Sequence, residues 1–337
     1  MKNTIKLFTL ENTNGVKAIL TNYGARLVSL ITLDSKGEKR DIVLGYDNSD
    51  AIVNGNQYFG STIGRFANRI AKGKFTLEGI EYTLLQNNGK NALHGGVEGY
   101  DTRIWSVKLD GNRISFKHLD KDMHEGYPGN VEVEVVYELT EKNELKISYF
   151  ATTDKTTHFN VTNHAFFNLR GAGNGNILNH KLQINADRFT PIDKNQIPTG
   201  EIVPVDGTPF DFRSFEEIGK NIDDDDEILA NGFGYDHNWV INGNENELKF
   251  CAKVIEPENG IVMEVFTTEP GVQLYTGNFL DKSDLGREGI GYGRREAFCL
   301  ETQHFPDTPN KENFPSTILK PGEKFFSQTI YKFGLES

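Results

Sequence analysis

The chain has 337 residues, and its 36 Lys and Arg against 48 Asp and Glu give a net charge of −12. So acidic a composition disfavours attraction to nucleic acid or to an anionic membrane, and no basic stripe offsets it. No run approaches the roughly 18 apolar residues of a membrane-spanning helix, and the first residues lack the apolar segment of a signal peptide. We therefore expect a cytoplasmic protein with no nucleic-acid or membrane partner.

The composition favours β-structure, with 34 Gly, 23 Phe and 12 Tyr but only 3 Met, and turn dipeptides recur along the chain. The two cysteines, Cys251 and Cys299, each lie within an apolar run and show no Cys-x-x-Cys spacing. This pattern predicts two buried small side chains rather than a disulfide framework or a metal site.

Apolar and polar residues alternate with a period of two in many segments, which is typical of strands with one wet face. In chain order, we expect two short strands around a Glu-Gly turn within 75–84, and further strands at 131–139, 145–150, 261–266 and 272–275. Helical periodicity is poor, and its best case is a short helix near Ser214–Ile218.

Neither a βαβ rhythm nor a dinucleotide-binding glycine fingerprint is present, which argues against a Rossmann enzyme. The acidic run Asp223–Glu227 lacks the ligand spacing of a Ca²⁺ loop, so we expect a solvated loop there. Strands this numerous curl or split into two layers. The sequence therefore predicts an all-β protein, one large antiparallel β-sandwich that forms a single domain over residues 1–337.

Five stretches combine ionisable groups with glycine and aromatic residues. The first, at 64–70, holds two arginines; they could be solvated surface residues, but Arg65 stands between a glycine and an aromatic and could hold sugar hydroxyls or a carboxylate. The second, at 91–96, places His94 before two glycines, at a strand end where backbone can approach a ligand.

The third stretch, at 160–169, alternates so that Thr162, His164 and Phe166 share one face. A histidine flanked by aromatic rings is a plausible positioned acid. The fourth, at 231–239, holds Asp236 and a histidine among three aromatic residues. The fifth, at 298–306, holds Glu301 at the end of an apolar strand, where burial raises the pKa of a carboxyl group toward that of a general base.

These stretches, in this order, resemble the aldose 1-epimerase (galactose mutarotase) family, and the likeness extends from about Gly15 to Phe333. The matching motifs are Gly-Arg-x-Ala-Asn-Arg-Ile at 64–70, Leu-His-Gly-Gly at 93–96, Gly-Tyr-Pro-Gly at 126–129, Asn-x-Thr-Asn-His-x-x-Phe-Asn-Leu at 160–169, Ile-Pro-Thr-Gly-Glu-Ile-Val-Pro-Val at 197–205, Pro-Phe-Asp-Phe-Arg at 209–213, Gln-Leu-Tyr-Thr-Gly-Asn-Phe at 273–279 and Leu-Glu-Thr-Gln at 300–303.

The resemblance implies the family's large β-sandwich, a free aldohexose such as galactose or glucose as substrate, no cofactor or metal, and a monomer. It implies that Glu301 is the general base for the C1 hydroxyl, that His164 is the general acid for the ring oxygen and that His94 is a second active-site histidine. The residues it implies for holding sugar hydroxyls are Arg65, Asp236 and Gln273. Such a reaction needs two acid–base groups and no covalent intermediate.

One departure from the family pattern is an apparent extra residue at Gly234–Tyr235, which could adjust the preferred hydroxyl configuration. Two alternatives stay open. An epimerase of the same fold that acts on a phosphorylated hexose would need a cluster of Arg or Lys. A non-catalytic carbohydrate-binding module would not need both His164 and Glu301. A glycoside hydrolase, which normally uses two carboxylates, fits less well.

Overall fold

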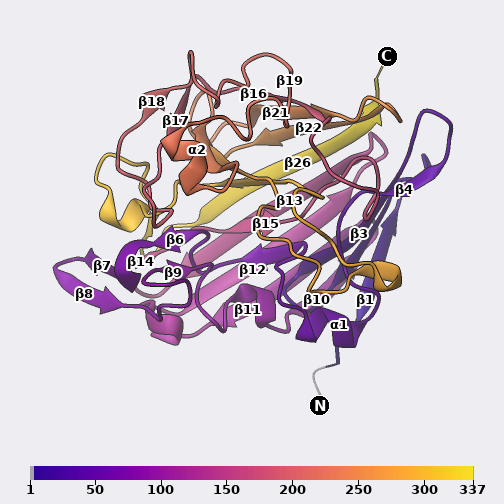
Figure 1. Cartoon of the computed structure of the whole chain (residues 1–337). Helices are drawn as coiled ribbons and strands as arrows, with labels where there is room; N and C mark the ends of the chain where they lie inside the picture. Colours follow the sequence, from indigo (N-terminus) through magenta and orange to yellow (C-terminus); the bar gives the residue numbers. More distant parts are fainter. Residues whose placement is uncertain (1–3, 337) are drawn as a thin grey trace.

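The computed structural model describes residues 4–336 and consists mainly of antiparallel β-sheets (Figure 1). Within these residues there are two short α-helices, α1 (Ser49–Asn54) and α2 (Glu227–Asn231). No helix among them is long and apolar enough to cross a membrane.

The largest sheet has nine strands and extends across the molecule behind the shorter strands in Figure 1. In spatial order its strands are β10 (Ser106–Asp110), β11 (Arg113–Asp120), β12 (Val131–Leu139), β13 (Glu144–Thr153), β26 (Phe325–Leu335), β22 (Ile261–Thr267), β21 (Lys249–Ile255), β16 (Lys181–Ile184) and β19 (Glu216–Glu217). On one side of this sheet β10, β11, β12 and β13 pair in chain order, and β26 joins them to the other half by pairing with both β13 and β22.

Two smaller sheets pack against this large one. The four-stranded sheet consists of β1 (Leu7–Glu11), β2 (Lys17–Thr21), β3 (Arg26–Leu33) and β4 (Lys39–Asp41). The five-stranded sheet consists of β18 (Val203–Pro204), β17 (Arg188–Thr190), β20 (Asp236–Val240), β23 (Gly271–Tyr275) and β24 (Cys299–Gln303). The remaining strands form the pairs β5 (Ser61–Ile63) with β15 (Thr162–His164), β6 (Arg69–Ile70) with β9 (Ala92–Leu93), β7 (Lys74–Leu77) with β8 (Ile80–Thr83) and β14 (Thr157–His158) with β25 (Ile318–Leu319).

The main hydrophobic core lies between the nine-stranded sheet and the two smaller ones. Alternate residues of the large sheet, such as Val135 and Ile147, meet Leu27 of β3 and Trp239 of β20 in one buried cluster. Burying one face of each strand leaves its other face for solvent or for a site. On the five-stranded sheet, the face away from this core carries the polar residues described below.

The predicted fold class is confirmed, and so are the predicted strands. The Glu-Gly turn lies between β7 and β8, the segment 131–139 coincides with β12, and 145–150, 261–266 and 272–275 lie in β13, β22 and β23. Cys251 and Cys299 are both buried and unbridged. Of the predicted loop Asp223–Glu227, the residues Asp223–Asp226 are a loop, whereas Glu227 begins α2, which Asp226 caps by accepting a hydrogen bond from the Leu229 amide.

The helix predicted near Ser214–Ile218 is wrong. Glu216 and Glu217 form β19, which pairs with β16 at the edge of the large sheet, and the Ile218 amide donates to His180 O at 2.9 Å. Ile218 is fully buried in the core. Pairing with a distant strand therefore outcompetes a local propensity that was weak in any case.

We expect Tyr137→Phe to lower the free energy of unfolding by about 1 to 2 kcal/mol, because it removes a buried hydroxyl with two partners. This hydroxyl donates to Ala25 O at 2.8 Å and accepts from Asn163 Nδ2 at 3.0 Å, and so ties β12 to the layer above it. Urea unfolding of both proteins would measure the difference. An unchanged midpoint would show that the hydroxyl is not such a tie.

Candidate active site

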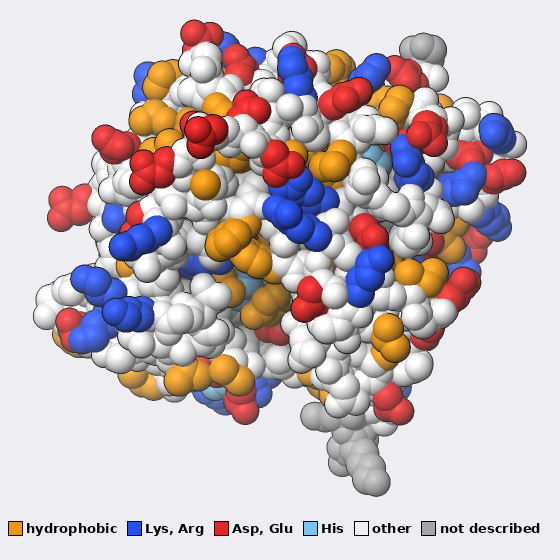
Figure 2. Space-filling view, viewed as in Figure 1, with side chains coloured by type: hydrophobic (Ala, Val, Ile, Leu, Met, Phe, Trp, Pro, Cys, Tyr) orange, Lys and Arg blue, Asp and Glu red, His pale blue; other side chains and the backbone are white. Residues whose placement is uncertain are grey.

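A cavity of about 360 Å³ opens on the face of the five-stranded sheet that lies away from the core. Figure 2 shows a hollow near the centre of one face of the molecule, bordered by hydrophobic side chains and with a histidine visible within it. The sequence-predicted residues that line the cavity are His94, His164, Asp236 and Glu301.

The antiparallel register of three strands determines which side chains reach this cavity. Gln273 of β23 pairs with Glu301 of β24 on one side and with Asn238 of β20 on the other. Asp236 lies two residues before Asn238 and shares its face, and Gln273 Nε2 donates to Asp236 Oδ1 at 2.7 Å. The structure therefore brings Asp236, Gln273 and Glu301 together on one face of the sheet.

His164 ends β15 and faces Glu301, with 3.5 Å between His164 Nε2 and Glu301 Oε1. The two side chains are only 5% and 2% exposed. Aromatic rings fix the imidazole plane: the Phe166 ring stacks on it at a centroid distance of 4.9 Å, and the Tyr58 ring at 5.7 Å. Phe166 also lines the cavity, so the predicted alternation of 164 and 166 onto one face is confirmed.

Burial shifts the pKa values of this pair in opposite directions, because a low-dielectric surrounding penalises the charged form of each. Desolvation, with a smaller contribution from the Asp236 charge, holds the pKa of Glu301 well above its usual range. Desolvation lowers the pKa of His164 to about 3. Glu301 Oε2 has no hydrogen-bond partner among the described residues. The uncharged forms of Glu301 and His164 are therefore favoured over the carboxylate and the imidazolium, and the pair can readily exchange one proton with a ligand.

His94 follows β9 at a left-handed φ of 54°, and its ring lies 5.2 Å from that of His164. The Asn68 amide donates to His94 Nδ1 at 3.1 Å, so the neutral ring carries its proton on Nε2. The next residue must be glycine, because the backbone of Gly95 lies against that of Gly64 and a Cβ there would be 2.1 Å from Gly64 O. His94 is therefore a fixed hydrogen-bond donor.

The arginine at the cavity is Arg69 rather than Arg65. Arg69 donates from Nε to Asn88 Oδ1 at 3.1 Å and from Nη2 to Gln196 Oε1 at 2.6 Å, and its Nη1 lies 3.7 Å from Asp236 Oδ2. Asn88 and Gln196 line the cavity as well. Together with Asp236 and Gln273, these side chains form a continuous polar belt beside the Glu301–His164 pair.

The structure does not bring Arg65 into the cavity. Its side chain is 1% exposed, and its Nε donates to the buried Asp120 carboxylate at 2.8 Å. Its Nη1 donates to Pro128 O at 2.7 Å. These contacts occupy the guanidinium, which consequently joins two segments of the chain instead of facing a ligand.

The loop at Gly234–Tyr235, where the sequence suggests an extra residue, follows Phe233, which lines the cavity. Gly234 has a φ of +127°, and a Cβ there would lie 2.7 Å from Asn278 Oδ1, so both conformation and space require glycine. Asn278 Nδ2 donates to Gly232 O and Tyr235 O and closes the loop. Phe233 is thereby directed to the rim, where its ring meets Phe279 at 5.4 Å.

His94, His164 and Glu301 offer ligand atoms within 4.8 Å of one another, which is a donor set typical of Zn²⁺ sites. Donation from Asn68 to Nδ1 leaves the other nitrogen of His94 protonated, however, so this ring does not fit a metal ligand. Glu98, His124 and Glu125 form a second such group. The guanidinium of Arg103 already occupies it, because Arg103 Nη2 contacts Glu98 and His124.

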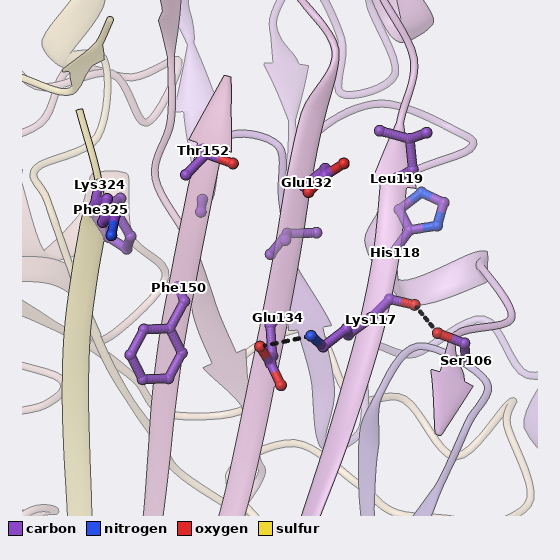
Figure 3. A pocket seen from close by; sticks show the side chains of 12 residues that line it. Ser106, Lys117, His118, Leu119, Glu132, Glu134, Phe150, Thr152, Lys324 and Phe325 are labelled. Atoms are coloured by element: carbon purple, nitrogen blue, oxygen red, sulfur yellow. Dashed lines mark hydrogen bonds and ion pairs between the residues drawn. The ribbon is translucent and has the colours of Figure 1, made fainter. Parts of the chain in front are cut away.

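A further cavity of about 470 Å³ lies over β11, β12 and β13 on the large sheet (Figure 3). Two of its charged side chains pair with each other, with 3.2 Å between Lys117 Nζ and Glu134 Oε2. Its single histidine, His118, faces no carboxylate within ion-pair distance in the described part of the chain. This surface lacks an acid–base pair, so the smaller cavity is the candidate active site.

Sequence reasoning missed Arg69, Asn88, Gln196 and Tyr58. Arg69 lies in the motif at 64–70 identified from the sequence. What distinguishes it from Arg65 as a cavity residue is the pairing of β6 with β9, which places Arg69 beside His94. The motif alone does not reveal this pairing. Gln196 lies in a loop that passes over the site from a distant part of the chain, and no local pattern marks it.

Comparison with known proteins supports one family. A model of the aldose 1-epimerase family matches residues 6–332. The chain is 44% identical to galactose mutarotase from Bos taurus over 98% of its length and 95% of that protein, and 37% identical to aldose 1-epimerase from Escherichia coli K12 over 97% and 95%. The crystal structure of an aldose epimerase homologue from C. elegans superposes with a TM-score of 0.91 at 31% identity, covering 99% of this chain and 100% of that one.

We expect Arg65→Met to lower the free energy of unfolding by about 3 to 5 kcal/mol, because it leaves the Asp120 carboxylate buried without its main partner. Arg69→Met, the same change four residues along, should cost less, because Asp236 keeps its bond from Gln273 and faces a cavity. Chemical denaturation of the two variants would compare them. Equal losses would contradict the structural role of Arg65.

Glu301→Gln should stabilise the protein, and the gain should grow with pH. An unfolded glutamate ionises near pH 4.5, whereas burial raises the pKa of the folded residue well above that value. Between the two pKa values the folded wild type binds more protons than the unfolded chain, so its stability falls as the pH rises, by about 1.4 kcal/mol per unit of pKa difference. The glutamine variant does not titrate.

The stability difference between wild type and Glu301→Gln should therefore increase from about pH 4.5 upward and become constant above the folded pKa. Thermal unfolding of both proteins from pH 4 to pH 9 would measure it. A constant difference across that range would rule out the raised pKa.

Proposed function

This chain belongs to the aldose 1-epimerase family, and on that premise we propose that it interconverts the α and β anomers of a free aldohexose through Glu301 and His164. As a member of this family it is an isomerase that acts on carbohydrates. The observation that carries the residue roles is the buried pair, in which Glu301 Oε1 and His164 Nε2 lie 3.5 Å apart beside a belt of polar side chains.

In the proposed reaction, the Glu301 carboxylate accepts the proton of the C1 hydroxyl while the His164 imidazolium gives its Nε2 proton to the ring oxygen. The C1–O5 bond breaks and the open-chain aldehyde forms, which leaves both side chains neutral. After rotation about C1–C2, Glu301 returns its proton to the carbonyl oxygen and His164 removes the proton of the O5 hydroxyl as O5 attacks the other face of C1. One proton is shared by the pair throughout.

The environment of the pair favours the ring-opening step. Burial raises the pKa of Glu301 and lowers that of His164, so it destabilises the charged starting pair more than the neutral pair that accompanies the aldehyde. An acid–base pair works best when its proton affinities are brought close to those of the groups it serves. His94, a fixed Nε2–H donor, would hold the sugar near the ring oxygen without titrating.

The polar belt would hold the remaining hydroxyls. In this proposal Asp236, Gln273 and Arg69 bind the sugar, and Gln196 and Asn88 keep the Arg69 guanidinium in place. Fixing the pyranose at several hydroxyls aligns C1 and O5 with the two acid–base groups, which is the main contribution that binding can make to such a reaction.

A free sugar suits this cavity better than a phosphorylated one. Arg69 is the only Lys or Arg among the described residues that line it, and its donors are engaged by Asn88 and Gln196. A phosphate dianion would call for several cationic side chains. A pure binding module would have no need of two oppositely shifted groups in contact, which favours catalysis over binding alone.

Three further expectations stand as proposals. A single domain over 1–337 is supported by a core cluster that draws residues from the four-, five- and nine-stranded sheets. A cytoplasmic location is supported by two buried, unbridged cysteines, and a monomer is the state that the resemblance implies.

Polarimetry on freshly dissolved α-D-galactose and α-D-glucose, with no added cofactor, tests the function. We expect the wild type to equilibrate one or both sugars much faster than the spontaneous rate. Glu301→Gln should lower kcat at least about a thousandfold, because no other group in the site replaces its base, while sugar binding measured by calorimetry stays largely intact. Acceleration of a hexose 6-phosphate alone would overturn the free-sugar proposal.

A further inference from the structure

The thiol of Cys299 lies directly behind the imidazole of His164. Cys299 begins β24, two residues before Glu301, and its Sγ is 3.5 Å from His164 Nδ1. No other residue in the described part of the chain forms a hydrogen bond with this nitrogen. The opposite nitrogen, Nε2, faces Glu301. Cys299 and Glu301 thus contact the two sides of one ring from the same strand face.

Resting on the proposed function, we propose that Cys299 is a positioning residue whose sulfur accepts a hydrogen bond from His164 Nδ1–H and so keeps Nε2 as the nitrogen that gives and takes back the proton. When the ring is an imidazolium, Nδ1–H donates to the sulfur and Nε2–H points to the cavity. When Nε2 has given its proton to the ring oxygen, the neutral ring still carries its proton on Nδ1, and the bond to the sulfur is unchanged because a thiol can accept a hydrogen bond.

The other histidines near the cavity show why this partner matters. His94 Nδ1 accepts from the Asn68 amide, a group that can only donate, so protonating that nitrogen would break the bond. His237 accepts from the Asp236 amide at Nδ1 and donates from Nε2 to Ile228 O, so both its nitrogens are committed. Of these three rings, only His164 has an Nδ1 partner that can accept a hydrogen bond from it.

The surroundings keep the thiol in the form that this role requires. Cys299 is fully buried, and desolvation, with the charges of Glu301 and Asp236, holds its pKa well above the usual range, so it remains an S–H group. The His164 ring cannot turn away from it, because Phe166 and Tyr58 stack on its faces and Tyr275 meets it edge-on at 6.3 Å. The contact is therefore maintained while the proton moves.

Two substitutions separate hydrogen bonding from packing. Cys299→Ala removes the partner and should lower kcat about three- to tenfold with little change in KM, which is the kinetic value of one modest hydrogen bond. Cys299→Ser retains a group that donates and accepts, on a shorter bond, and should keep more activity than the alanine variant. Cys251→Ala removes the other fully buried thiol, which lies outside the cavity lining, and should leave kcat unchanged.

The tautomer of His164 gives a readout that a packing role would not move. Long-range ¹H–¹⁵N spectra of ¹⁵N-histidine-labelled protein, assigned with His164→Gln, should show a protonated Nδ1 in the wild type near neutral pH. Cys299→Ala should shift population toward the Nε2–H tautomer, and Cys251→Ala should not.

A wild-type His164 that is neutral and protonated only on Nε2, or a Cys299→Ala variant with full kcat, would overturn the inference while leaving the epimerase function intact. Absence of any acceleration by the wild type would instead refute the proposed function. In that case the tautomer spectra would still decide whether His164 Nδ1–H donates to the sulfur.

Discussion

The site depends above all on the register in which β20, β23 and β24 pair. Because side chains alternate across a strand, one register places Trp239, Leu274 and Leu300 in the core and Asp236, Gln273 and Glu301 on the opposite face. A slip by one residue would bury the carboxylates in the core and expose the apolar residues. The hydrophobic energy that fixes the fold therefore also fixes the relative positions of the polar groups, with no separate scaffold for the site.

The same arrangement makes the site costly to stability. Glu301 Oε2 and Gln273 Oε1 are buried without partners among the described residues, and Asp236 keeps a raised pKa despite Arg69 beside it. A folded protein tolerates such groups only where the surrounding packing outweighs them. Here that packing is the core beneath the same strands, which includes Trp239, Leu274 and Leu300.

Much of the fold and the site could be predicted from the sequence because the relevant patterns are local. Alternation over 131–139 determines both the strand and its buried face, and it likewise placed His164 and Phe166 on one side. What could not be predicted depends on pairing between distant segments. The choice between Arg65 and Arg69 is decided by β6 meeting β9 and by Asp120 lying against the first arginine, and the segment at 214–218 is a strand only because β16 lies beside it.

Histidine chemistry illustrates the same division between residue type and context. His94, His164 and His237 are all buried, and burial lowers the pKa of each, so neither exposure nor pKa direction distinguishes them. The partner of Nδ1 does. A backbone amide keeps Nδ1 of His94 and of His237 unprotonated, whereas a thiol can accept a hydrogen bond from Nδ1–H of His164. A donor-only partner suits a residue that binds throughout a reaction, and a partner that accepts suits one whose Nε2 must give and take back a proton. The assignment of acid and binding roles within this cavity thus follows from hydrogen-bond direction at a single ring nitrogen.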